Sequence, residues 1–449
     1  MTAPARIAAF QALRAIADGR ADLPSALART RTQLTDERDR GLAAEIVSGS
    51  LRWQRSLDHL VAGFASRPLA KIERNVLLIL RLSLYQLLHL DRVPASAVVD
   101  DAVDLARHAR KAAAAGFVNA VLRSALRQRH RLPLPARPDA LSDRRALVAY
   151  LGITHSHPDW LVARWLDRFG FEATERWVRF NNETPRLTLR ANTLRCTRDA
   201  LAAALAEGEV STEPTRYSPA GLTVAGGNPL RSPLDGSFLV QDEASQLVSA
   251  AVGAQPGERL LDLCAAPGGK TVAMAGDMKD RGLIVASDVR AKRISLLDHT
   301  VRISGAQCVR VTRVAASGEL PFAPAFDRVL VDAPCSGLGT IRRDPDIRWR
   351  RREADLRPLA ADQLALLDRA ASVVRAGGRL IYATCSSEPE ENEQVIDAFL
   401  RDRRGFALVD LRPDATILRP LLDERGMLRT LPFAHGLEAF FAAVVVRSA

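Results

Sequence analysis

A chain of 449 residues is too long for one hydrophobic core and indicates roughly two to four domains. Its composition, 47% hydrophobic and 26% charged, is that of a globular protein, and five irregularly spaced cysteines exclude a disulfide framework or a CxxC zinc site. The net charge is +11, and the most apolar stretch, residues 76–90, is broken by Arg81 and shorter than the ~20 residues that span a bilayer. We therefore expect a cytoplasmic protein without membrane contact and with a polyanionic partner.

Residues 1–140 are predicted to form an all-helical domain. Apolar residues recur there at spacings of three and four, most clearly over 100–129. The stretch 132–143 contains three prolines and is predicted to be a linker. Residues 1–145 carry 24 basic and 14 acidic residues, whereas the remainder carries 39 and 38. The positive charge is thus concentrated in the helical domain, which favours nucleic-acid binding there.

Residues 141–250 are expected to form a connection and a small second unit. A helix is predicted over 157–182 within a helical connector at 141–183. Alternating residues then predict a strand at 185–194, followed by a helix at 197–208 and a short strand at 220–226. This pattern predicts a small α+β unit at 184–250.

From residue 251 to the C-terminus the pattern alternates between strands and helices. Strands are predicted at 259–264, 282–288, 308–312, 326–332, 378–385 and 440–447. Such alternation is typical of a doubly wound, mostly parallel sheet with helices on both faces. Ligands bind such sheets outside the carboxyl ends of the strands, where Asp262, Asp288, Asp332, Cys335 and Cys385 all fall.

The glycine-rich turn 262–271, "DLCAAPGGKT", directs backbone amides toward a ligand at the start of a helix. Cys264 stands where a P-loop needs glycine, and Pro267 removes an amide that would bind phosphate. Asp288, about twenty residues further on, is placed to accept hydrogen bonds from ribose hydroxyls. The pattern favours a nucleoside without a polyphosphate, S-adenosylmethionine being the common one. A nucleoside triphosphate and an ordinary strand–helix turn are the alternatives.

Cys335 and Cys385 each follow a predicted strand, and a nucleophilic role explains the pair best. A thiolate that adds to carbon 6 of cytosine makes carbon 5 reactive toward a methyl sulfonium. Asp332 could stabilise that adduct at ring nitrogen 3, and the second thiol could assist release. The spacing does not decide which thiol attacks. A redox disulfide is the lesser alternative, and further soft ligands for a metal are missing from both segments.

These motifs resemble those of the RNA 5-methylcytosine methyltransferases, and most of all the bacterial RsmB (Sun, Fmu) group. The resemblance covers almost the whole chain. In the C-terminal half it involves "GSFLVQDEASQL", "DLCAAPGGKT", "DAPCSGLGTIRRDPDIRW" and "YATCSSEPEENEQVI", and further upstream "LRANTLR". Segments 38–53 and 93–123 are similar to the NusB-like domain that marks this group.

The resemblance implies a Rossmann-like methyltransferase domain at 251–449, behind a NusB-like domain and a small RRM-like, RNA-facing unit. It implies S-adenosylmethionine as cofactor, and as reaction the methylation of a cytosine carbon 5 in 16S rRNA rather than DNA, by a monomer. Cys385 would be the nucleophile, Cys335 the residue that assists release, and Asp332 would lie between cofactor and base. The implied cofactor contacts are Cys264, Ala265, Ala266, Pro267, Gly268, Gly269, Lys270, Asp288 and Asp332. The family commonly has an aspartate after the third strand, but residues 310–318 contain no acidic residue.

RNA contacts are predicted in two places. The "LRANTLR" segment contributes Arg190 and Asn192, and the arginine-rich run that follows Cys335 contributes Arg342, Arg343 and Arg348. The acidic run 388–393 is interpreted as the first turn of a helix, where carboxylates complement the helix dipole, and not as a metal cluster. A different class of function, an RNA-binding module on an inactive methyltransferase scaffold, is disfavoured by the intact cysteines and glycine turn.

Overall fold

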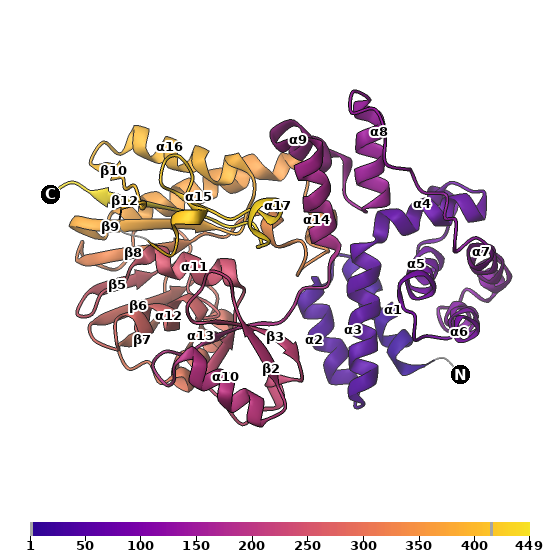
Figure 1. Ribbon diagram of the computed structural model, residues 1–449, viewed down its shortest axis with the longest axis horizontal. Helices are drawn as coiled ribbons and strands as arrows, with labels where there is room; N and C mark the ends of the chain where they lie inside the picture. Colours follow the sequence, from indigo (N-terminus) through magenta and orange to yellow (C-terminus); the bar gives the residue numbers. More distant parts are fainter. Residues whose placement is uncertain (1–2, 414–415) are drawn as a thin grey trace. The chain divides into compact units, whose positions relative to one another are not determined.

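The computed structural model describes residues 3–413 and 416–449 and divides into two compact units. The first holds the described residues up to Thr184 together with Ile341–Arg351, and the second holds Pro185–Thr340 and Arg352–Ala449. Figure 1 colours both along the sequence. Within the described ranges, no helix is both long enough and apolar enough to cross a bilayer.

The first unit is helical. Its helices are α1 (Pro4–Ala17), α2 (Leu23–Gln33), α3 (Glu37–Arg52), α4 (Gln54–Ala65), α5 (Arg74–His89), α6 (Ala95–His108), α7 (Ala115–Arg127), α8 (Arg144–Ala149), α9 (Asp159–Asn182) and α14 (Ile347–Arg350), with short turns η1 (Leu69–Lys71), η2 (Ala112–Ala114) and η3 (Tyr150–Thr154). Asp22 and Asp36 cap α2 and α3 by accepting hydrogen bonds from backbone amides. The apolar faces of α1 to α7 form one continuous core.

Helix α9 kinks at Gly170, whose φ of +75° lies in the region that glycine adopts without a steric penalty. The kink lets Trp165 and Trp177 stack with ring centroids 4.4 Å apart. Both rings are fully buried, so they form the centre of this part of the unit.

The segment 341–351 lies inside the predicted methyltransferase domain in sequence but packs with the first unit. Arg348 is fully buried there and donates hydrogen bonds to the backbone carbonyls of Arg52, Ser156 and Asn181. Trp349 donates from Nε1 to the carbonyl of Leu51 at 2.6 Å. These contacts hold a segment that begins six residues after Cys335 within the helical unit.

The second unit begins with a small sheet of order β2-β3-β1-β4. Its strands are β1 (Thr188–Ala191), β2 (Ser211–Pro214), β3 (Gly221–Gly226) and β4 (Phe238–Val240), with α10 (Arg198–Glu207) and the turn η4 (Pro229–Arg231). Leu189, Leu201 and Leu222 join the strands and α10 in a common core. The predicted strands and helix are present, whereas β2 and β4, with four and three residues, are too short to have been predicted.

The main sheet has the order β10-β12-β9-β8-β5-β6-β7, with β11 paired to β12. Its strands are β5 (Arg259–Asp262), β6 (Leu283–Asp288), β7 (Val309–Arg313), β8 (Phe326–Asp332), β9 (Val374–Thr384), β10 (Phe406–Leu408), β11 (Leu428–Arg429) and β12 (Phe441–Arg447). Strands β5 to β9 pair in parallel, whereas β12 runs antiparallel to β9. The predicted mostly parallel sheet is confirmed.

Helices cover both faces of this sheet (Figure 1). They are α11 (Glu243–Val252), α12 (Gly269–Asp277), α13 (Ala291–Ser304), α15 (Leu356–Ala371), α16 (Glu393–Asp402) and α17 (Pro432–His435), with turns η5 (Leu338–Thr340), η6 (Glu353–Asp355), η7 (Pro389–Glu391) and η8 (Arg419–Leu421). Successive strand residues alternate between the two cores. Leu260 packs with α11, α12 and α13, whereas Leu261 packs with α15 and α16.

Candidate active site

The polar ends of four parallel strands meet at one edge of the main sheet. Strands β5, β6 and β8 end at Asp262, Asp288 and Asp332, and β9 ends at Thr384, directly before Cys385. In register, Asp262 lies opposite Ala286 and Leu330, and Asp332 lies opposite Ala383. The pairing therefore brings the predicted cofactor and cysteine residues to the same edge.

The glycine turn joins β5 to α12. Gly268 stands before the helix with a φ of +110°, and a Cβ there would come within 3.0 Å of Leu297. Arg293 from α13 donates to the carbonyl of Ala266 at 2.6 Å. The turn from Cys264 to Lys270 is thus held in place by α13, and the first amides of α12 are available to a ligand.

Two carboxylate side chains, Asp262 and Asp288, lie at the strand ends next to this turn. Asp262 accepts a hydrogen bond from Thr271 at 2.7 Å, and burial raises the pKa of its carboxyl group to about 7. Burial and the neighbouring carboxylates raise the pKa of the Cys264 thiol to about 12. Among described residues, Asp262 Oδ1 and Asp288 Oδ2 are buried without a hydrogen-bond donor, although Arg293 Nε lies 3.3 Å from Asp288 Oδ2. These two oxygens fit a ligand that donates hydroxyl groups, as a ribose does.

A cavity of about 960 Å³ lies beside the turn, large enough for a nucleoside cofactor. Its walls include Cys264, Val289, Arg290, Glu319, Pro334 and Gln363. Glu319 directly follows the stretch 310–318 that has no acidic residue. The loop after β7 therefore does bring a carboxylate to the cavity, a few residues later than the family pattern suggests.

The two cysteines lie in direct contact. Their Sγ atoms are 3.3 Å apart although fifty residues separate them in the chain. The hydrogen bond to Cys385, together with burial, raises the pKa of the Cys335 thiol well above its usual value. Cys335 is therefore the protonated partner, and its S–H can donate to the sulfur of Cys385.

Lys270 connects the glycine turn to this pair. Its Nζ lies 2.7 Å from Asp332 Oδ2. Burial acts to lower the pKa of Lys270, but the charges of Asp332, Cys385 and Asp262 outweigh it and raise the pKa. Lys270 thus places a positive charge between the glycine turn and the cysteine pair.

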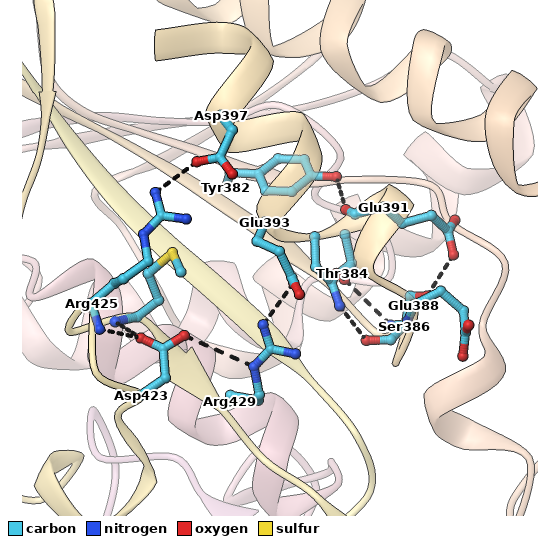
Figure 2. A network of polar contacts seen from close by, with 12 residues as sticks. Tyr382, Thr384, Ser386, Glu388, Glu391, Glu393, Asp397, Asp423, Arg425 and Arg429 are labelled. Carbon is cyan, nitrogen blue, oxygen red and sulfur yellow. Dashed lines mark hydrogen bonds and ion pairs between the residues drawn. The ribbon is translucent and has the colours of Figure 1, made fainter. Parts of the chain in front are cut away.

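The acidic run after Cys385 contains a buried residue next to the cysteine turns that the sequence interpretation missed. Glu391 in η7 is fully buried and is not a helix-dipole residue at the surface. Its carboxylate accepts hydrogen bonds from Ser336, Gln363 and Ser386. Figure 2 shows Glu391 beside Ser386 and Tyr382, whose hydroxyl donates to the Glu391 carbonyl. Within the described ranges, no three His, Cys, Asp or Glu side chains gather as they would around a metal ion.

The structure corrects three of the predicted RNA contacts. Arg190, Asn192 and Arg348 are 7%, 2% and 0% exposed. Asn192 donates to the carbonyls of Gly236 and Ser304, and Arg348 donates to carbonyls within the first unit, so both side chains serve packing.

Two arginines of the same run reach closer to the surface. Arg342 lies over the ring of Phe180, 3.9 Å from its centroid, and Arg343 is half-buried. RNA contact stays a prediction for these two residues.

The sheet, the glycine turn and the carboxylate at the end of β6 define a Rossmann-like, S-adenosylmethionine-dependent methyltransferase. Family models for 16S rRNA methyltransferase RsmB/F, the NusB family and the RsmF/B-like ferredoxin-like domain match residues 250–446, 3–127 and 157–231. A probable ribosomal RNA small subunit methyltransferase B of Bacillus subtilis is 35% identical, covering 91% of this chain and 90% of its own. Ribosomal RNA small subunit methyltransferase B of Pseudomonas putida is also 35% identical, covering 99% and 98%. The chain belongs to the 16S rRNA methyltransferase RsmB/F family.

Solved structures agree with the fold. The crystal structure of PH0851 superposes over 99% of both chains with a TM-score of 0.81 and 26% identity. NSun6 from Pyrococcus horikoshii, solved with the S-adenosylmethionine analogue SFG, covers 66% of this chain and 100% of its own with a TM-score of 0.59 and 19% identity.

Proposed function

We propose that the protein methylates carbon 5 of a cytosine in 16S rRNA through a covalent bond between Cys385 and carbon 6 of the base. The observation that carries the proposal is the contact between the sulfurs of Cys335 and Cys385, 3.3 Å apart at the sheet edge that also holds the glycine turn. S-adenosylmethionine supplies an electrophilic methyl group there, held by the 264–270 turn, Asp288 and the cavity that Glu319 lines.

Cys385 is proposed as the attacking group because its sulfur contacts the thiol of Cys335 and interacts with the charge of Lys270. Lys270 contributes a positive charge that interacts with Cys385, and the high pKa of Cys335 keeps that thiol protonated. When the sulfur of Cys385 bonds to carbon 6, the carbon 5–carbon 6 double bond opens and its electrons become available at carbon 5.

The pair Lys270 and Asp332 is proposed to hold the base during this step. A carboxylate accepts from the exocyclic amine of cytosine, and an ammonium donates toward ring nitrogen 3 as negative charge develops. The two groups lie 2.7 Å apart, Lys270 at the start of α12 and Asp332 at the end of β8, so both can face one base.

Cys335 is proposed to act after methyl transfer. The proton on carbon 5 must leave before the carbon 5–carbon 6 double bond re-forms and the bond to Cys385 breaks. Cys335 touches the leaving sulfur, so it can pass its own proton to that sulfur as the bond breaks and take up the carbon 5 proton in exchange. Its loss should therefore stop the reaction after adduct formation and not before.

The proposed substrate, 16S rRNA, is inferred from the names of similar proteins. Several proteins more than 30% identical over nearly the whole chain carry the name ribosomal RNA small subunit methyltransferase B. The excess of basic residues in the NusB-matching region suits a polyanion. An enzyme acting on rRNA would work in the cytoplasm.

The test compares two cysteine variants with labelled cofactor and 16S rRNA. Cys385→Ala should transfer no label and form no covalent complex, whereas Cys335→Ala should accumulate an enzyme–RNA adduct that survives denaturing electrophoresis. Near-wild-type turnover of Cys385→Ala would reject the mechanism. A protein that only binds RNA would transfer no label in any form, and bisulfite sequencing of rRNA from a strain lacking the gene would identify the missing methylcytosine.

A further inference from the structure

Glu391 is unusual because its carboxylate lies wholly inside the protein and accepts most of its hydrogen bonds from the two cysteine turns. Its Oε1 accepts from the backbone amide of Ser336 at 2.7 Å and from Gln363 Nε2 at 3.0 Å. Its Oε2 accepts from the hydroxyls of Ser336 and Ser386. A carboxylate with this many donors is stable in the interior without a cation.

The partners of Glu391 occupy equivalent places in two turns. Ser336 directly follows Cys335, and Ser386 directly follows Cys385. The two hydroxyls also lie 3.2 Å apart. The carboxylate therefore joins the two turns one residue beyond the two sulfurs, and its hydrogen bonds act on the distance between them.

Glu391 is itself held firmly. The hydroxyl of Tyr382, on strand β9, donates to the Glu391 carbonyl, and the neighbouring Asn392 donates to the carbonyl of Ser386 at 3.0 Å. Figure 2 shows this arrangement around Tyr382, Thr384, Ser386 and Glu391. Because β9 fixes the backbone of Glu391, the carboxylate is a rigid reference for both turns.

A second contact between the same turns shows how closely they approach. The amide of Gly339 donates to the carbonyl of Cys385 at 2.9 Å, and a Cβ at Gly339 would lie only 2.8 Å from that same carbonyl oxygen. The turn after Cys335 thus packs directly on the turn after Cys385, and a small displacement of either would separate the sulfurs.

We propose that Glu391 is a positioning residue that holds the turns of Cys335 and Cys385 together, so that the thiol of Cys335 stays in contact with the sulfur of Cys385. The inference rests on the proposed function for its catalytic consequence. The geometric part, the spacing of the two thiols, can be measured without any RNA.

The primary measurement is the rate at which diamide, a thiol oxidant, joins Cys335 to Cys385. In this reaction two S–H bonds break, one S–S bond forms and diamide takes up both hydrogens. The wild type should form this bond readily. Its formation is measured by mass spectrometry of alkylated peptides. Glu391→Ala and Ser386→Ala should form it about tenfold and about threefold more slowly, since each removes part of the link between the turns.

Conservative and control variants separate positioning from folding. Glu391→Gln keeps the length and can still accept two hydrogen bonds and donate two to the serine hydroxyls, so it should recover most of the rate. Glu391→Asp is one methylene shorter and should not. Glu393→Gln, which alters the Arg429 pair on the next turn of the same segment, should match the wild type.

Activity supplies the second readout. Glu391→Ala and Ser386→Ala should lower kcat, by about a hundredfold and about fivefold, with the KM for S-adenosylmethionine within twofold. Disulfide formation at the wild-type rate in both variants would overturn the inference whatever the enzyme does to RNA. Absence of methyl transfer by the wild type would instead reject the proposed function and leave the thiol measurement valid. Should Glu391→Ala not fold, Ser386→Ala decides alone.

Discussion

The basic run 342–352 and the acidic run 388–393 are both rich in charges that a sequence places at the surface, yet each contains a charged side chain with 0% exposure. In the basic run it is Arg348, and in the acidic run it is Glu391. Arg348 donates mainly to backbone carbonyls of the helical unit, whereas Glu391 accepts mainly from side chains in the two cysteine turns. The first arrangement connects parts of the helical unit, and the second is the one that we propose holds the two cysteine turns together.

The largest effect that this comparison predicts is on stability. Arg348→Ala removes every donor to the carbonyls of Arg52, Ser156 and Asn181 and should lower the free energy of unfolding of the first unit by about 3 kcal/mol. The chain's tryptophans at 53, 160, 165, 177 and 349 all lie in this unit, so tryptophan fluorescence in urea reports it selectively.

A matched surface variant controls this measurement. Arg107→Ala breaks an exposed pair with Asp104 and should cost less than about 0.5 kcal/mol. If Arg348→Ala were as stable as Arg107→Ala, the buried guanidinium would not hold the segment. Glu391→Gln should leave the tryptophan transition unchanged.

A smaller effect is expected from pH. Burial, together with a hydrogen bond that the protonated Asp344 donates to Asp346, raises the pKa of Asp344 to about 8. Because the folded pKa lies above the unfolded value of 3.8, the folded state holds an extra proton between these values. The contribution of Asp344 to the stability of the first unit should therefore fall as pH rises from about 4 to about 8.

Asp344→Asn isolates that contribution. The pKa values of His89 and His155 are lowered to about 4, so these groups change stability in the opposite direction below pH 6.5, and wild type and variant must be compared at each pH. Between pH 6.5 and 8 the advantage of the wild type should fall by at most about 2 kcal/mol. A difference independent of pH would show that Asp344 is ionised throughout.

The same contrast separates what could be predicted from what could not. Strand periodicity places Asp262, Asp288, Asp332 and Cys385 at strand ends, and the rule for parallel sheets brings those ends to one edge. Both steps depend on local pattern and on a general property of the fold. The main sheet and the grouping of these residues could therefore be predicted from the amino-acid sequence alone.

The buried charges were not predictable, because their partners lie far away in sequence. Arg348 is held by carbonyls that lie more than 160 residues upstream, and Glu391 by Ser336, 55 residues upstream. A run of like charges predicts exposure, and composition carries no information about a distant acceptor. The short strands β2, β4, β10 and β11 were not predicted for a related reason, since two to four residues are too few to show an alternating pattern.

A prediction of intermediate size distinguishes the two kinds of buried charge. Asn182 supplies a side-chain acceptor to Arg348 at 3.0 Å, so Asn182→Ala should cost the first unit about 1 kcal/mol without altering thiol spacing. Ser386→Ala removes one hydrogen bond of similar strength but should change the rate of disulfide formation. The comparison fails if Asn182→Ala slows diamide oxidation as much as Ser386→Ala does.

The smallest effect concerns Arg343, a half-buried member of the basic run for which RNA contact remains a prediction. One phosphate contact contributes weakly to affinity but contributes a full counterion to the salt dependence. Arg343→Ala should therefore weaken RNA binding only about two- to fivefold, while the slope of log K against log salt should fall by about one. Arg375→Ala is the matched control, because Arg375 pairs with Asp327 at the opposite, amino-terminal edge of the main sheet. Fluorescence anisotropy over a salt series measures both the affinity and the slope. Equal slopes for the two variants would show that Arg343, like the buried Arg348, does not contact RNA phosphates.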